Sequence, residues 1–101
     1  MKTYDELESS VIDWANARQI IQNSTPAAQA TKTLEETKEL IYAIAQNNQA
    51  EVIDAYGDIL VTIIIGAKVA GLDLVECLEV AYSAIKDRTG HLNEQGVFVK
   101  D

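Results

Sequence analysis

The chain has 101 residues, of which 48% are hydrophobic, and its formal charge at pH 7 is −8. This size and composition are typical of one globular domain, residues 1–101, and exclude an intrinsically disordered chain. The acidic balance argues against binding of nucleic acid through its phosphates, because no basic stripe is present to displace counterions.

The first helix is expected to begin after Thr3, because Thr3 and Glu6 form a capping-box pattern. A loosely helical apolar stripe follows, made of Leu7, Val11, Trp14, Ala15, Ile20 and Ile21. The motif NSTP ends this helix, and Pro26 suits the first turn of the next one.

The second helix is expected to continue to about residue 46, with Leu34, Ile41 and Ile44 facing a core. The third helix is expected over residues 50–70, with Asn48 as a cap and Gly71 as the stop.

After Asp58 the third helix reads ILVTIIIGAKVAG, which is apolar around nearly its whole circumference. A strand can be argued for residues 59–65, but the flanking caps and the length favour a helix. A helix of this kind is surrounded by protein on most sides. Four short helices give it limited cover, so we expect a homodimer or a homotetramer.

A fourth helix is expected from a cap at Asp73 to about Asp87. The segment RTGHLNEQGVFVK has two glycines and a short β-prone run, which indicates a loop or a hairpin-like tail. The sequence therefore predicts an all-α protein, a four-helix bundle-like protomer with a short C-terminal hairpin-like tail.

Compartment is indicated by three features. The first ten residues, MKTYDELESS, are polar where a signal peptide is apolar. The longest uncharged run, residues 59–67, is too short to cross a bilayer. Cys77 has no partner for a disulfide within the chain and is expected to be a buried small hydrophobe. A cytoplasmic protein without membrane contact is expected.

Acidic residues form a ridge on each of the two central helices. A helix advances about 100° per residue, so one ridge of roughly 80° contains Gln29, Lys32, Glu36, Glu39 and Ala43. The other ridge, of roughly 60°, contains Glu51, Asp54 and Asp58. The short connection makes the helices antiparallel neighbours, which sets Glu36 opposite Asp58.

Two interpretations of these acids are open. On an amphipathic helix alone, EETKE is a solvated face. Asp54 and Asp58, however, stand at the head of a segment expected to be buried, and buried aspartates need partners. Facing carboxylates repel one another unless a cation lies between them, and hard oxygen ligands suit Mg²⁺ or Mn²⁺. A metal site is the favoured interpretation.

This ordered set of acids resembles the MazG-like all-α nucleoside triphosphate pyrophosphohydrolases, whose hallmark is EExxE followed by ExxD. Glu35, Glu36 and Glu39 match the first half as EETKE, and GDILV resembles the Gly-Asp and apolar run of the family. The segments WANARQI, QATKTLEE and AIKDRTGHLNEQGVFVK resemble the short single-domain versions of phages and bacteria.

One position departs from the family pattern. The family glutamate lies three residues before the aspartate that corresponds to Asp58, and this position is Ala55 here. Glu51 and Asp54 form a literal ExxD one turn earlier, and Asp54 is our candidate for the substitute ligand.

The resemblance implies hydrolysis of a (d)NTP to the monophosphate and pyrophosphate. Mg²⁺, or Mn²⁺, would be held by Glu36, Glu39, Asp54 and Asp58. Glu35 or Glu36 would serve as the general base.

Five further residues are candidates for substrate binding, each with a structural alternative. Lys32 contacts phosphate or pairs with Glu36 on its own helix. Gln29 contacts phosphate or base, or is merely exposed. Lys86 and Arg88 contact phosphate or complement the helix dipole. Trp14 stacks on the base or packs in the core.

Two other functions compete with an enzyme. The first is a catalytically silent helical oligomer that binds a nucleotide or a protein, for which Ala55 is the best support. The second is an acidic mimic of DNA phosphates, which predicts acids spread over an exposed face.

Overall fold

The computed structural model describes all 101 residues and contains five helices followed by two strands. The helices are α1 (Tyr4–Ala17), α2 (Ile20–Asn23), α3 (Pro26–Ala45), α4 (Gln49–Val69) and α5 (Leu74–Ile85), and the strands are β1 (Gly90–Leu92) and β2 (Phe98–Lys100). The all-α class is confirmed. The expected tail is an antiparallel hairpin in which His91 pairs with Val99.

Most helix ends lie where the capping residues predict them. The Thr3 side chain accepts a hydrogen bond from the backbone N–H of Glu6, and the Glu6 side chain accepts one from Thr3. Asn48 caps α4 by accepting a hydrogen bond from the N–H of Glu51, and Asp73 caps α5 by accepting one from the N–H of Val75. Gly71 follows α4 with a φ of 74°, a left-handed conformation that favours glycine.

The first helix is shorter than expected. Gln19 has a φ of 60° and turns the chain, so that Ile20 begins the separate short helix α2. The predicted continuous stripe to residues 20 and 21 is therefore wrong, and the protomer has five helices rather than four.

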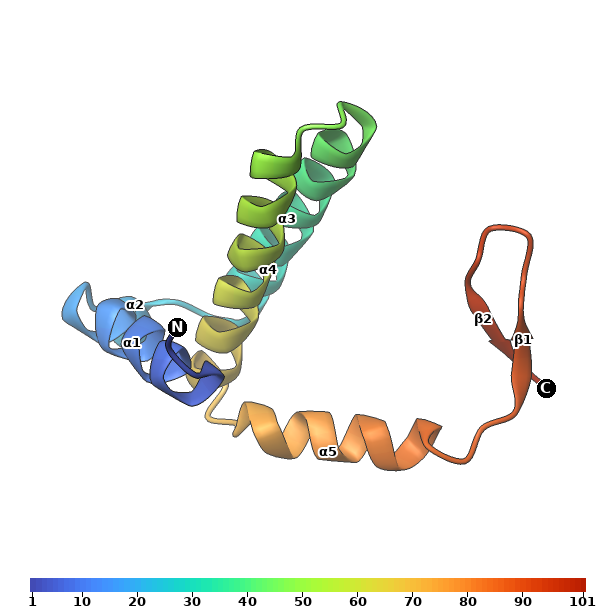
Figure 1. Ribbon diagram of the computed structural model, residues 1–101. Helices are drawn as coiled ribbons and strands as arrows, with labels where there is room; N and C mark the ends of the chain where they lie inside the picture. The colour runs from blue at the N-terminus through green and yellow to red at the C-terminus, as the bar shows by residue number, and fades with distance from the viewer.

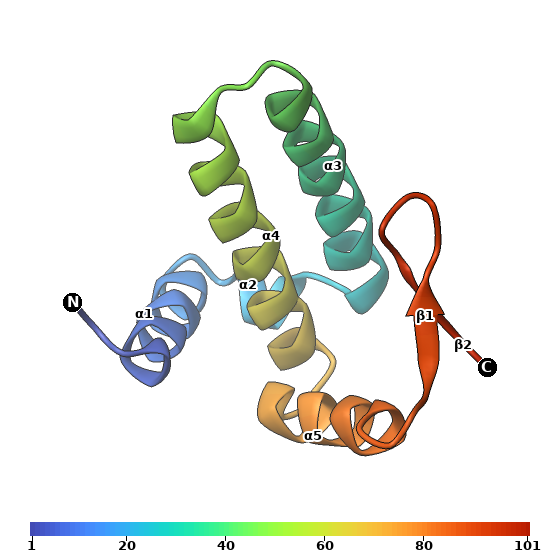
Figure 2. The same ribbon diagram turned by 45° about the vertical axis from the view of Figure 1, so that its right-hand side comes forward.

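The antiparallel pair α3 and α4 forms the centre of the fold, and the two helices lie side by side in both views (Figures 1 and 2). α1 packs against the half of α4 that is far from the α3–α4 turn. α5 and the hairpin project outward from that same end (Figure 1). No helix combines the length and hydropathy that a membrane span requires.

Few side chains are buried within one protomer. The eight buried residues are Ala15, Glu36, Leu40, Ala43, Ala55, Thr62, Ile64 and Ile65. α3 thus turns the face of Glu36 toward α4, and Leu34, Ile41 and Ile44 are each more than half exposed. The expectation that this apolar stripe faces the core is wrong for the protomer. Cys77, expected to be buried, is exposed as well.

Candidate active site

A three-residue turn brings the two acidic helices together. Asn47, two residues after the end of α3, has a left-handed conformation with a φ of 53°. The side chain of Asn48 then caps α4 by accepting a hydrogen bond from the N–H of Glu51 at 3.3 Å. This tight reversal makes α3 and α4 antiparallel, which sets the acidic ridge of one helix against that of the other.

Two carboxyl groups of the facing helices, Glu39 and Asp58, have raised pKa values. The pKa of Glu39 is raised, first by a hydrogen bond with Glu36 and then by the charge of Glu36. The pKa of Asp58 is raised by its burial and by the charges of Asp54 and Glu36. Lys32 opposes both shifts without reversing them. The group therefore carries more negative charge than its surroundings neutralise.

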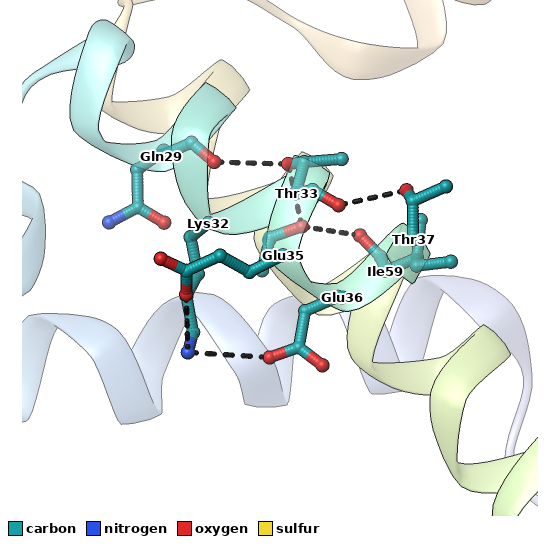
Figure 3. A network of polar contacts seen from close by, with 8 residues as sticks. Gln29, Lys32, Thr33, Glu35, Glu36, Thr37 and Ile59 are labelled. Carbon is teal, nitrogen blue, oxygen red and sulfur yellow. Dashed lines mark hydrogen bonds and ion pairs between the residues drawn. The ribbon is translucent and has the colours of Figure 1, made fainter. Parts of the chain in front are cut away.

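Lys32 lies between two acids of its own helix. Its Nζ is 3.4 Å from Glu35 Oε2 and 3.4 Å from Glu36 Oε1 (Figure 3). These contacts raise the pKa of Lys32, the hydrogen bond with Glu35 most of all. The intrahelical ion pair expected as one alternative is thus present. The ammonium group is about half exposed, so its contact with phosphate stays a prediction.

Glu36 has an oxygen without a partner. Its Oε2 is shielded from solvent and has no hydrogen-bond partner while the neighbouring carboxyl groups are ionised, and the residue is only 8% exposed. The chain has one other side-chain atom of this kind, Glu8 Oε2, which lies in a different hollow beside Lys68. An ionised buried oxygen is costly without a partner. The carboxylate oxygens of this group are ligands suited to a hard divalent cation, which would be a partner for Glu36 Oε2.

The present rotamers do not form a closed metal site. No three Asp, Glu, His or Cys side chains surround a common point at metal-binding distances. Glu39 and Asp54 are exposed, so their side chains have room to change rotamer. Coordination by all four acids therefore requires at least a rotation of side chains. Ala55, at the position of the missing family acid, is buried on α4.

A cleft of about 880 Å³ opens beside Glu36 and Asp58, within the usual size of small-molecule sites. Its walls come from the end of α1, from α2, and from the facing parts of α3 and α4. Three of the expected substrate-binding residues line it: Trp14, Gln29 and Lys32. These three residues therefore line the same cleft as Glu36 and Asp58.

The sequence did not reveal Arg18 and Asn23, which also line the cleft. The Arg18 guanidinium lies 4.4 Å from the centre of the Trp14 ring and donates a hydrogen bond to the Trp14 carbonyl at 3.1 Å. Trp14 is 47% exposed, so its alternative role as a core residue is wrong. Both missed residues flank the chain reversal at Gln19, which no sequence pattern indicated.

Lys86 and Arg88 are not brought to the cleft. Lys86 caps the C-terminal end of α5 and Arg88 follows it, and both are exposed. Neither lines the cleft, and α5 points away from α3 (Figure 1). Their contact with phosphate stays a prediction.

The fold is that of a MazG-like pyrophosphohydrolase. The chain superposes on the cyanophage S-2L MazG-like pyrophosphohydrolase, whose structure holds dGDP and three catalytic Mn²⁺ ions per active site. The TM-score is 0.75 over 99% of this chain and 94% of the cyanophage chain, at 21% sequence identity.

The sequence then places the chain within a family. It belongs to the phosphoribosyl-ATP pyrophosphohydrolase family, whose profile matches residues 5–84 and so includes all four acids. An uncharacterized 18.2 kDa protein from the rep-hol intergenic region of Haemophilus phage HP1 is 33% identical over 75 residues. That match covers 74% of this chain but only 46% of the phage protein. The resemblance drawn from EETKE and GDILV is confirmed.

Proposed function

We propose that this protein hydrolyses a (deoxy)nucleoside triphosphate to the monophosphate and pyrophosphate. The observation that carries the proposal is the partnerless, buried Oε2 of Glu36, set among three further acids at the edge of a nucleotide-sized cleft. Family membership and the fold shared with a nucleotide-bound pyrophosphohydrolase support it. A role in nucleotide-pool housekeeping is consistent with this chemistry.

Glu36, Glu39, Asp54 and Asp58 are the proposed ligands of Mg²⁺ or Mn²⁺. When bound, the cation would offset the charge of the triphosphate and activate water for attack at phosphorus. The excess negative charge that raises the pKa of Glu39 and Asp58 favours occupation by a divalent ion.

Glu35 is the better of the two candidate general bases. The Glu36 side chain is held against α4 by burial, which suits a fixed ligand. The Glu35 side chain is 59% exposed and its only polar contact is with Lys32, so it has room to move and accept a proton from an attacking water molecule. When Glu35 moves, the Lys32 ammonium keeps its contact with Glu36 and has further N–H donors available for a phosphate group.

The cleft supplies the contacts for the rest of the substrate. Trp14 offers an aromatic face that Arg18 partly covers, so a base stacks there only beside or in place of the guanidinium. The Gln29 side chain donates a hydrogen bond to Ser24 Oγ at 2.9 Å, which fixes its carbonyl oxygen for contact with the nucleotide.

Pyrophosphate release tests the proposed reaction. The purified protein is incubated with Mn²⁺ or Mg²⁺ and a panel of (d)NTPs together with phosphoribosyl-ATP. We expect pyrophosphate release from at least one compound, loss of this activity in Glu36→Gln, and normal activity in the charge-matched Glu79→Gln on α5. Absence of release from every compound would refute the reaction, and release of a single orthophosphate would refute the choice of bond.

We also propose that the protein is a homo-oligomer. Its accessible surface is 7674 Å², whereas a compact monomer of 11.1 kDa exposes about 5,700 Å². Its radius of gyration is 15.8 Å, against about 13 Å for a compact domain of this length. The surplus of about 2,000 Å² per chain matches the interfaces of obligate homodimers.

The exposed apolar stripes of the central pair supply such a surface. On α3 the stripe consists of Leu34, Ile41 and Ile44, and on α4 of Ile53, Tyr56, Leu60 and Ile63. A second copy is the proposed occupant because both stripes belong to the central helix pair and carry no charge.

A catalytically silent nucleotide-binding module is the second candidate, and buried Ala55 favours it. In that case a nucleoside triphosphate binds in the presence of Mn²⁺, as calorimetry would show, but stays intact over hours of incubation. Analysis of the nucleotide after incubation, either intact or hydrolysed, therefore separates the two functions.

A further inference from the structure

One side-chain hydrogen bond connects the two acidic helices. Thr33 Oγ1 of α3 lies 2.7 Å from Thr62 Oγ1 of α4, and Thr62 is only 6% exposed. Every other side-chain hydrogen bond or ion pair made by α3 stays within that helix or the residues before it. This bond is therefore the single direct polar link across the α3–α4 interface.

The direction of the bond follows from counting protons. Thr33 Oγ1 is also 3.0 Å from the Gln29 carbonyl, and Thr62 Oγ1 is 2.7 Å from the Ile59 carbonyl (Figure 3). Two hydroxyl protons must serve three contacts. The two shorter contacts are satisfied together when Thr33 donates to Thr62 and Thr62 donates to the Ile59 carbonyl. The chain of bonds then ends on the residue that follows Asp58.

This link lies one helical turn from the proposed metal ligands. Thr33 precedes Glu36 by three residues, and Thr62 follows Asp58 by four. Because the helices are antiparallel, both threonines lie on the same side of the two acids, about 5 Å along the axis. The bond thus sets the separation of the helices where Glu36 faces Asp58.

The close approach of α3 and α4 continues one helical turn further from the acids. A Cβ atom placed on Gly66 would lie 3.3 Å from the Cβ of Gln29, which shows how closely the backbones approach there. A side chain at this position would require Gln29 to shift by a few tenths of an ångström. The glycine permits the close approach, and the threonine pair gives it a defined distance.

We propose that Thr33 and Thr62 are positioning residues that hold Glu36 and Asp58 at the separation required to share a divalent cation. This inference rests on the proposed function, because it assigns the cation to these acids. Groups that hydrogen-bond directly to a metal ligand change the affinity for the ion by about 10- to 100-fold when they are removed. Because the threonines act through the helix backbones, we expect an effect at the lower end of this range.

Single valine substitutions test the pair without leaving a buried donor unpaired. In Thr62→Val, the Thr33 hydroxyl can still donate to the Gln29 carbonyl, and in Thr33→Val, the Thr62 hydroxyl still donates to the Ile59 carbonyl. Thr37→Val is the matched control, because the Thr37 hydroxyl donates to the Thr33 carbonyl at 2.8 Å and forms no bond to α4.

The readout is the dissociation constant of Mn²⁺, measured by calorimetry without nucleotide, with circular dichroism to verify the fold. We expect each of Thr62→Val and Thr33→Val to weaken Mn²⁺ binding about tenfold, and the double variant to weaken it little further. Thr62→Ser, which keeps the hydroxyl, and Thr37→Val should stay within about twofold of wild type.

Two results would overturn the inference: wild-type affinity in Thr62→Val and Thr33→Val, or an equal loss in Thr37→Val. If Thr62→Val does not fold, Thr33→Val decides alone. A protein that binds Mn²⁺ in this pattern but releases no pyrophosphate would refute the proposed reaction and leave the positioning role supported.

Discussion

Glu36→Gln should stabilise the metal-free protein and abolish its response to metal. Glu36 combines burial, a partnerless oxygen and like-charged neighbours, all of which cost free energy without a cation. The glutamine has the same shape, and its amide group donates a hydrogen bond to an adjacent carboxylate oxygen. The substitution therefore removes the charge and satisfies the buried position at once.

The contacts of Glu36 set the size of the effect. A buried polar atom without a partner costs about 1–3 kcal/mol, and a half-exposed ion pair such as that with Lys32 contributes about 0–1 kcal/mol. The net expected gain is about 1–2 kcal/mol. For a domain of this size, each kcal/mol raises Tm by about 4–8 °C.

Thermal unfolding in EDTA and in excess Mn²⁺ checks this expectation. At a concentration about 100 times the Kd, the ion stabilises the wild type by about 2.7 kcal/mol. The order of stability should then reverse, with Glu36→Gln above the wild type in EDTA and below it in Mn²⁺. The charge-matched Glu79→Gln should follow the wild type in both. Equal responses of Glu36→Gln and the wild type to Mn²⁺ would show that Glu36 is not a ligand.

Three further outcomes are expected. The pKa values of Asp58 and Glu39 are raised, so the metal-free folded state binds more protons than the unfolded chain. Its stability should therefore fall as pH rises from about 4 through the raised values, which unfolding in EDTA at successive pH values checks. The affinity for Mn²⁺ should rise over the same pH range. Ile41→Glu should shift the protein to smaller species in sedimentation experiments without loss of helicity, because it places charge in the proposed interface. Ala55→Glu should lower the stability of the metal-free protein, because it buries an unpaired charge, and should tighten Mn²⁺ binding in calorimetry.

Local signals in the sequence were sufficient for the helices and for the acidic ridges. Capping residues such as Thr3, Asn48 and Asp73 satisfy backbone groups within three residues, so their effect does not depend on the rest of the fold. The ridges follow from the helical repeat, and the short turn after Asn47 then makes the two helices antiparallel. Glu36 and Asp58 accordingly influence each other, as the spacing predicted.

The cleft depends on information that the sequence does not carry locally. At the chain reversal, Gln19 has a left-handed conformation, which glycine and asparagine adopt more readily than glutamine. The residue type at this position therefore did not indicate a turn. This turn places Arg18 and Asn23 in the wall of the cleft that Lys32 also lines, although the segments that carry them share no periodic pattern. The sequence does not indicate the threonine pair for another reason. Thr62 lies in an apolar run, and only the packing of α3 on α4 shows that its hydroxyl has a partner in Thr33.

The orientation of α3 shows why hydrophobic periodicity predicted the wrong inner face. Periodicity identifies the face that must be covered, but it does not say whether the cover comes from the same chain. In the protomer, small residues of α4, Ala55 and Thr62 among them, admit the face of Glu36, and the Leu34 and Ile41 face stays outside. Each face of α3 then has its own proposed partner, a divalent cation for the acids and a second copy of the chain for the apolar stripe. We expect the α3–α4 pair to gain stability from each proposed partner, because the buried Glu36 lies among like charges on the inner face and Leu34, Ile41 and Ile44 are exposed on the outer face.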